Sequence, residues 1–162
     1  MPDAFTLAEW GLPGLFLVAA VAGSILPAPS EAVLAALVYG GVAPAPAVAV
    51  ATVGNVLGAL TVYAMGRWVA RGGGGAVGRW VQRRAASEGP RLARAQERLA
   101  RWGSPLLALA WVPVVGDVFV LAAGFVGVRW APFVGFVTLG KGLRYLFVAW
   151  SAAAAAHAGI SP

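Results

Sequence analysis

The sequence predicts an all-α membrane protein in which two re-entrant helical hairpins and two full transmembrane helices form an inverted repeat, with a cytoplasmic amphipathic connecting helix. Hydrophobic residues make up 60% of the 162 residues and mean hydropathy is +0.79, so the chain has more apolar surface than a soluble domain of this length can bury. Proline interrupts two of the apolar segments, and the two halves of the chain resemble each other. We expect one membrane domain, with a first repeat over 11–69, a basic connector over 70–103 and a second repeat over 104–156.

The apolar segments differ in whether they are continuous. Segments 45–67 and 131–156 have the length of ordinary transmembrane helices, because about 20 helical residues span a membrane. Segments 11–42 and 104–128 are each broken by proline close to an acidic residue. The stretch after each break has 12 residues, which as a helix is about 18 Å long and too short for a hydrocarbon core of about 30 Å. We therefore expect each broken segment to dip into the membrane and return to the same side; a single kinked helix is the alternative.

The two halves align without a gap at an offset of 86 residues, with 12 identities in the 41 pairs from 26/112 to 66/152. Chance would give about five in so apolar a chain. The breaks fall in register, and Glu31 meets Asp117. The residues that mark the breaks are Pro27, Pro29, Pro113 and Gly116. Since only 45–67 crosses between the re-entrant segments, the second copy is inverted, and paired breaks of this kind point to a transporter's binding site.

Basic residues set the expected orientation. Of the twelve, nine lie in one stretch: Arg67, Arg71, Arg79, Arg83, Arg84, Arg91, Arg94, Arg98 and Arg101. Between apolar segments such a cluster indicates a cytoplasmic loop that meets anionic lipid headgroups, and we do not expect nucleic acid as a partner. The acidic Asp3 and Glu9 then lie outside, and the lack of a basic residue near them argues against a cleaved signal peptide.

The connector has its own organisation. Residues 72–75 are glycines and predict a flexible joint, and 87–102 predicts a helix with arginines on one side. Leu92, Leu99 and Trp102 fall on another side, so we expect this helix to lie along the membrane surface, with a solvated loop helix as the alternative.

Composition argues against several chemistries. The chain has no cysteine, and its single histidine, His157, lies in an alanine-rich tail. Thiolate and histidine metal sites are therefore not expected, and no nucleophile–base pair suggests an enzyme. We expect no catalytic residues, no metal and no cofactor.

Ionisable groups at membrane depth are the candidate functional residues: Glu31, Asp117, Lys141 and Arg144. A charge there costs several kcal/mol unless it is paired or hydrated, so function is the first hypothesis. Their formal charges sum to zero, and Asn55 occupies the position that matches Lys141 in the first repeat. Structural roles are the alternative: Ser30 could cap the helix that Glu31 begins and Asp117 could cap its own helix, or the acids could only neutralise the cations.

At these residues the chain resembles the DedA (VTT-type) family of small membrane proteins, and most closely its YqaA branch. The matching stretches are LPAPSE (26–31), GNVLG (54–58), WVPVVGD (111–117) and GKGLRY (140–145). The resemblance implies two facing re-entrant hairpins and a link to the flipping or scrambling of phospholipids and polyprenyl-phosphate carriers. It also implies that Glu31, Asp117 and Arg144 are functional. The family pattern has arginines where this chain has Ala110 and Gly116.

Two functions follow as hypotheses. The first is a DedA-type transporter of the bacterial inner membrane that couples proton movement to translocation of a lipid or polyprenyl phosphate. Lys141 and Arg144 would attract the anionic headgroup, and Glu31 and Asp117 would take up and release protons. Asn55 completes the set of proposed proton or substrate residues. The second is a non-transporting membrane scaffold whose buried charges are structural ion pairs. A homo-oligomer is compatible with both.

The orientation is testable, because single thiols can be introduced into a chain without cysteine. Both termini and the 43–46 connection should be periplasmic, with 70–103 cytoplasmic. A membrane-impermeant reagent added to intact cells should label Ser161→Cys and leave Ser87→Cys unlabelled. The reverse pattern would overturn the orientation.

Overall fold

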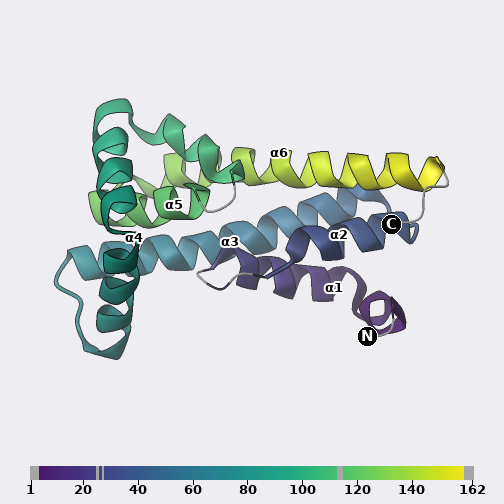
Figure 1. Cartoon of the computed structure of the whole chain (residues 1–162), viewed down its shortest axis with the longest axis horizontal. Helices are drawn as coiled ribbons and strands as arrows, with labels where there is room; N and C mark the ends of the chain where they lie inside the picture. Colours follow the sequence, from purple (N-terminus) through teal and green to yellow (C-terminus); the bar gives the residue numbers. More distant parts are fainter. Residues whose placement is uncertain (1–3, 25, 27, 113–114, 159–162) are drawn as a thin grey trace. The chain divides into compact units, whose positions relative to one another are not determined.

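The computed structural model describes residues 4–24, 26, 28–112 and 115–158, with side chains from Gly11 onward. This part of the chain is helical and contains no strand. Its elements, in chain order, are α1 (Ala4–Gly23), α2 (Ser30–Tyr39), α3 (Pro44–Ala70), α4 (Gly75–Trp102), the 3₁₀ helix η1 (Ser104–Trp111), α5 (Val115–Val126) and α6 (Trp130–His157) (Figure 1).

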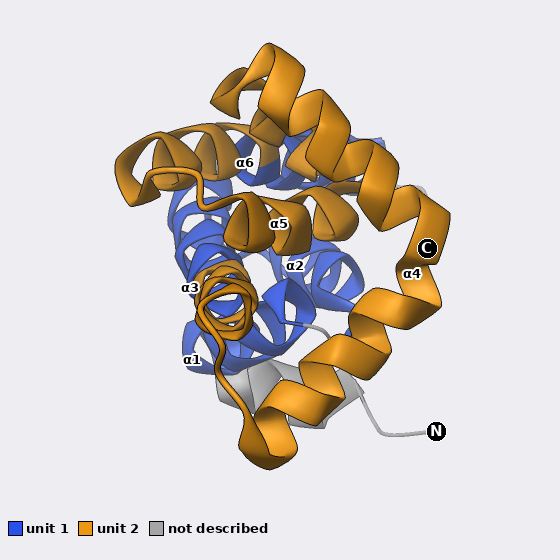
Figure 2. Ribbon diagram, turned by 90° about the vertical axis from the view of Figure 1, so that its left-hand side faces the viewer, with its two compact units in different colours: residues 1–58, 141–162 blue, residues 59–140 orange. Residues whose placement is uncertain are grey.

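The chain divides into two compact units (Figure 2). Unit 1 comprises residues 1–58 and 141–162, so it holds α1, α2, the first part of α3 and the last part of α6. Unit 2 comprises residues 59–140 and holds the rest of α3, α4, η1, α5 and the first part of α6. Each unit therefore contains one broken apolar segment and parts of both long helices.

Both broken segments fold back on themselves as helical hairpins. In unit 1, α2 returns alongside α1 and packs against it, and in unit 2, α5 packs against η1 (Figure 1). Each broken segment therefore consists of two helical pieces that pack against each other. Pro27 and Pro113 lie outside the described residues, whereas Pro29 directly precedes α2 and Gly116 lies in the first turn of α5.

The first limbs of the hairpins are less regular than the sequence suggests. In α1 the backbone leaves helical geometry at Gly11, where φ is 46°, a value that favours glycine. The first limb of the second hairpin is a 3₁₀ helix, longer than the three or four residues usual for that structure. It begins with Ser104 and Pro105, and the crowding of Gly116 against Ala110 shows how tightly it meets α5.

Two helices, α3 and α6, are long and apolar enough to cross a membrane. Only 33% of the most apolar window of α6 is buried inside the protein, which differs from the core helix of a soluble protein. Large apolar side chains at helical spacing form an exposed stripe along α6: Leu139, Leu143, Leu146, Phe147 and Trp150. Contact with lipid accounts for this stripe better than contact with water.

Small residues let the helices within each unit approach closely. In unit 1, a Cβ on Gly58 would lie 2.1 Å from the carbonyl oxygen of Ala20, and one on Gly23 would lie 2.0 Å from that of Asn55. In unit 2, Gly140 meets the Ala108 carbonyl in the same way. Close backbone approach at small residues is the usual basis of helix packing in membranes.

The connector helix α4 begins earlier than expected and packs within its own unit. It starts at Gly75 instead of residue 87, and a kink at Gly89, with φ of 31°, separates its two parts. Leu92 and Leu99 are buried because α4 packs against α5, while Trp102 stays exposed. The apolar side predicted to rest on the membrane is thus largely covered by the protein itself.

The close approach at Gly58 gives a test of the packing. Gly58→Ala places a methyl group where the α1 backbone lies, and overpacking of this kind costs about 1–3 kcal/mol. Thermal unfolding in detergent should show a clear loss of stability. Gly135→Ala is the matched control, because nothing lies within 4 Å of its Cβ position and alanine favours helix, so it should be neutral or stabilising.

Candidate functional site

A chain of hydrogen bonds crosses the interior of unit 1. The Lys141 ammonium donates to the side-chain oxygen of Asn55, and the Asn55 amide donates to the Tyr145 hydroxyl at 2.7 Å. The Tyr145 hydroxyl in turn lies 2.8 Å from the hydroxyl of Ser30. All four residues are at most 6% exposed, so the chain is shielded from solvent along its whole length.

Three helices supply these residues. Ser30 is the first residue of α2, directly after the break, and Asn55 lies on α3. Lys141 and Tyr145 are one turn apart on α6 and so share a face. Asn55 and Lys141 each lie 11 residues from the start of their helix, or about 16 Å, which is close to half the hydrocarbon thickness for an upright helix.

An ion pair lies beside this buried chain. Arg144 on α6 approaches Glu31 on α2 to 2.5 Å. Their side chains are 29% and 33% exposed, so the pair is accessible from outside the unit while the hydrogen-bond chain is not. Because Glu31 follows Ser30 and Arg144 precedes Tyr145, the start of α2 is attached to α6 by two adjacent interactions.

Thr52 adds an unsatisfied polar group to the same interior. It lies on α3 one turn before Asn55 and is 8% exposed, and its hydroxyl has no hydrogen-bond partner in the described part of the chain. That hydroxyl lies 3.9 Å from the position of a Cβ on Gly142, which indicates that the glycine leaves room on the facing helix. A buried hydroxyl without a partner is costly, and a polar guest such as water would satisfy it.

Four of the five predicted proton or substrate residues come together in unit 1: Glu31, Asn55, Lys141 and Arg144. Asp117 belongs to unit 2, where it is exposed in the first turn of α5. The capping role suggested for Ser30 is wrong, because α2 has no side-chain cap and the Ser30 hydroxyl bonds Tyr145 instead. Asp117 is the third residue of its helix and not its first, so it does not begin α5.

Sequence reasoning missed the role of Tyr145. In GKGLRY (140–145) the arginine and lysine drew attention, whereas a tyrosine in an apolar helix resembles a core residue. The signal that could have found it is the i, i+4 spacing from Lys141, which places its hydroxyl on the face that carries the cation. A buried tyrosine hydroxyl usually requires a partner, and here it has two.

The arrangement places a guanidinium and a carboxylate together at a partly exposed position. Among the described residues, no group of three His, Cys, Asp or Glu side chains could hold a metal ion. The guanidinium of Arg144 is a strong ligand for a phosphate oxygen, and the carboxylate of Glu31 is the competing anion and can accept a proton.

Comparison with known proteins gives consistent matches. The family model for the VTT domain matches residues 13–153. "Inner membrane protein YqaA" of Escherichia coli (strain K12) is 37% identical over 136 residues, covering 83% of this chain and 86% of the relative, and its Shigella flexneri counterpart gives the same values. An "Uncharacterized protein" of Haemophilus influenzae is 31% identical over 140 residues, covering 82% of this chain and 81% of the relative. No solved structure matches the chain.

The hydrogen-bond chain predicts a stability effect at Asn55. Asn55→Leu removes one acceptor of the buried Lys141 ammonium and the amide that donates to the Tyr145 hydroxyl, and loss of a hydrogen bond to a charged group costs about 2–3 kcal/mol. Thermal unfolding in detergent should show the loss, and adding Lys141→Leu should restore part of it. Thr52→Val is the matched control on the same helix, because it removes a hydroxyl without a partner, and it should not destabilise the protein. Equal stability of Asn55→Leu and the native chain would contradict the interpretation.

Proposed function

This chain belongs to the VTT domain family, the DedA family of membrane proteins, and on that premise we propose that it is a transporter. Its activity is the proton-linked translocation of a lipid or polyprenyl phosphate across the bacterial inner membrane. The family's association with membrane transport and the inner-membrane relatives support the class of function. The observation that carries the mechanism is the accessible ion pair between Glu31 and Arg144 at the start of a hairpin limb.

The mechanism follows from competition for Arg144. While Glu31 is ionised it holds the guanidinium at 2.5 Å. Uptake of a proton removes the charge of Glu31, weakens that attraction and leaves Arg144 able to bind a phosphate oxygen. Release of the proton restores the pair and displaces the phosphate. Proton movement and headgroup binding are thereby linked at one residue pair.

Re-entrant hairpins and an inverted repeat are part of the proposal. With 10 residues, α2 is about 15 Å long and cannot cross a hydrocarbon core of about 30 Å, which supports a limb that ends at membrane depth. The contact between Asn55 and Lys141 supports the inversion, because these residues are 86 positions apart and match each other in the repeat. Residues that match under a two-fold relation meet each other only near its axis.

Asp117 is the second proposed proton-exchanging acid. It matches Glu31 in the repeat and likewise lies in the first turn of a short hairpin limb. We place the termini in the periplasm and α4 in the cytoplasm, on the basis of the arginines of the connector.

A membrane scaffold without transport is the second candidate, and the buried hydrogen-bond chain favours it. Lys141, Asn55, Tyr145 and Ser30 are all buried and bonded in sequence, as expected of groups that fix helices together. The accessible pair of Glu31 and Arg144 is what favours the transporter, since an anionic headgroup can reach a guanidinium that is partly exposed.

Neutralising the acids separates the two functions. Because the Glu31–Arg144 pair is about one-third exposed, its loss should resemble that of a surface pair, about 1 kcal/mol or less, and not the 3–5 kcal/mol of a buried one. Glu31→Gln and Asp117→Asn should therefore fold and insert but lose translocation. The measurement uses liposomes with labelled lipids in one leaflet and an imposed pH gradient, alongside thermal unfolding in detergent.

Glu97→Gln changes an exposed acid of α4 in the same way and should keep full activity. The double variant Glu31→Gln, Arg144→Gln should be folded and inactive. A single variant that unfolds, with fold and activity both restored in the double, would favour the scaffold. Full activity of both Glu31→Gln and Asp117→Asn would end the proton-linked mechanism.

A further inference from the structure

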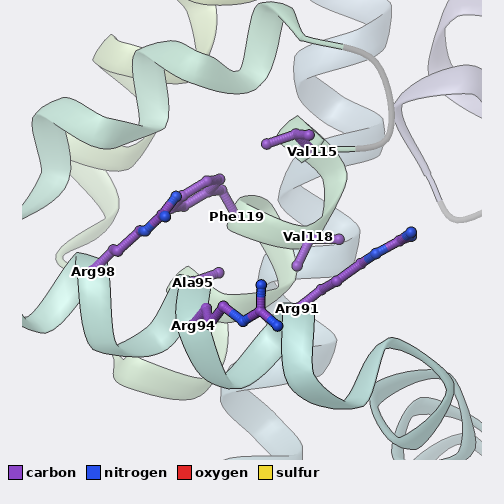
Figure 3. Close-up of a pocket in the computed structure, with 7 residues that line it drawn as sticks. All are labelled: Arg91, Arg94, Ala95, Arg98, Val115, Val118 and Phe119. Carbon is purple, nitrogen blue, oxygen red and sulfur yellow. The ribbon is translucent and has the colours of Figure 1, made fainter.

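A separate cavity of about 350 Å³ lies in unit 2, between the connector helix and the second hairpin. Residues of α4 and α5 line it: Arg91, Arg94, Ala95, Arg98, Val115, Val118 and Phe119 (Figure 3). No residue of the candidate site in unit 1 contributes to it. We propose that this cavity binds the phosphate headgroup of an anionic lipid.

The sequence of α4 builds the charged side of the cavity. Arg91, Arg94 and Arg98 follow one another at spacings of three and four residues, so they share one face of the helix. Leu92, Ala95 and Leu99 are buried and hold this part of α4 against the rest of unit 2. The three arginine side chains leave α4 on the side where the α5 residues lie (Figure 3).

The kink at Gly89 sets this part of the helix apart. Its φ of 31° is strained for any residue with a side chain, and Pro90 follows it directly. Arg91, Arg94 and Arg98 all lie in the part of α4 that follows this kink, and they line the cavity together with residues of the first turns of α5.

Among the described residues, the ion pairs are Arg84–Glu88 and Arg144–Glu31, and neither involves Arg91, Arg94 or Arg98. By contrast, Arg84 on the same helix pairs with Glu88 at 2.8 Å, which shows that α4 can satisfy an arginine internally. Three like charges on one helix face repel one another, and a bound anion would remove that repulsion. Guanidinium groups bind phosphate oxygens with paired hydrogen bonds, so phosphate suits the site better than a monovalent halide.

The apolar side of the cavity distinguishes a lipid from free phosphate. The side chains of Val115, Val118 and Phe119 have no hydrogen-bonding group for a free phosphate, but they suit the glycerol backbone and first methylene groups of a lipid. The volume lies at the lower end of small-ligand pockets, about 300–1,000 Å³. It accommodates a headgroup and not the acyl chains, which would extend into the bilayer. Anionic lipids are available at the cytoplasmic face proposed for α4.

The test compares two triple variants of the full chain that remove the same charge. Arg91→Gln, Arg94→Gln, Arg98→Gln empties the cavity of cations, and Arg71→Gln, Arg79→Gln, Arg83→Gln removes three exposed arginines that do not line it. Binding of short-chain phosphatidylglycerol to protein in neutral detergent is measured by native mass spectrometry and by thermal shift. Native mass spectrometry should show one bound lipid fewer on the cavity triple than on the native chain, and the thermal shift should indicate lipid binding at least about tenfold weaker. The control triple should behave as the native chain does.

Further arms separate the sources of phosphate. Inorganic phosphate and short-chain phosphatidylcholine should give no comparable thermal shift. Val115→Glu, at a residue that is 46% exposed, keeps every arginine but adds a carboxylate at the apolar side, and it should also weaken phosphatidylglycerol binding. Circular dichroism verifies that each variant is folded. Equal effects of the two triples, no effect of either, or a shift by inorganic phosphate equal to that by the lipid would each overturn the proposal.

Discussion

The constraint on which unit 1 depends is the need to satisfy a buried ammonium group in a largely apolar interior. Lys141 is 5% exposed, and a charge at this depth is costly unless it is hydrogen-bonded. The bond to Asn55 begins a chain that continues through Tyr145 to Ser30, so one cation organises side chains from α2, α3 and α6. The position of the hairpin limb α2 follows from this, because Ser30 is its first residue and the neighbouring Glu31 reaches Arg144. The contacts that satisfy the buried polar side chains therefore also position α2.

Small residues make that organisation possible. The short side chain of Asn55 can accept a hydrogen bond from a side chain of another helix only if the two backbones are close. The backbone carbonyl of Asn55 occupies the space that a side chain on Gly23 of α1 would need. Gly54, which directly precedes Asn55, and Gly58, three residues after it, approach the backbone of α1 in the same way. The glycines that look like simple packing residues therefore also determine where the polar groups lie. Replacing them would displace the hydrogen-bond chain as well as the helices.

Patterns with a local cause could be predicted from the sequence, and features that depend on tertiary contacts could not. Hydropathy predicted α3 and α6 to within a few residues, and the proline–acid breaks predicted that each of the other two apolar segments divides into two helical pieces. The rarity of membrane charges pointed to Glu31 and Arg144, which do pair. The 3₁₀ form of η1, the early start of α4 and its packing on α5 had no signal in hydropathy or spacing. Tyr145 was missed because its polar tip matters only once Asn55 and Ser30 lie beside it.

The repeat also explains why one half of the site is cationic and the other is neutral. Under the proposed two-fold relation, Asn55 and Lys141 occupy equivalent positions and lie against each other near the axis. Two lysines there would place like charges in contact at low dielectric constant, which is strongly unfavourable. Two asparagines would satisfy each other but leave no cation at depth. One lysine facing one asparagine keeps a single positive charge and gives it an acceptor. At the centre of the proposed inverted repeat, one charged and one neutral residue is therefore the combination that places a single cation at this contact and gives it an acceptor.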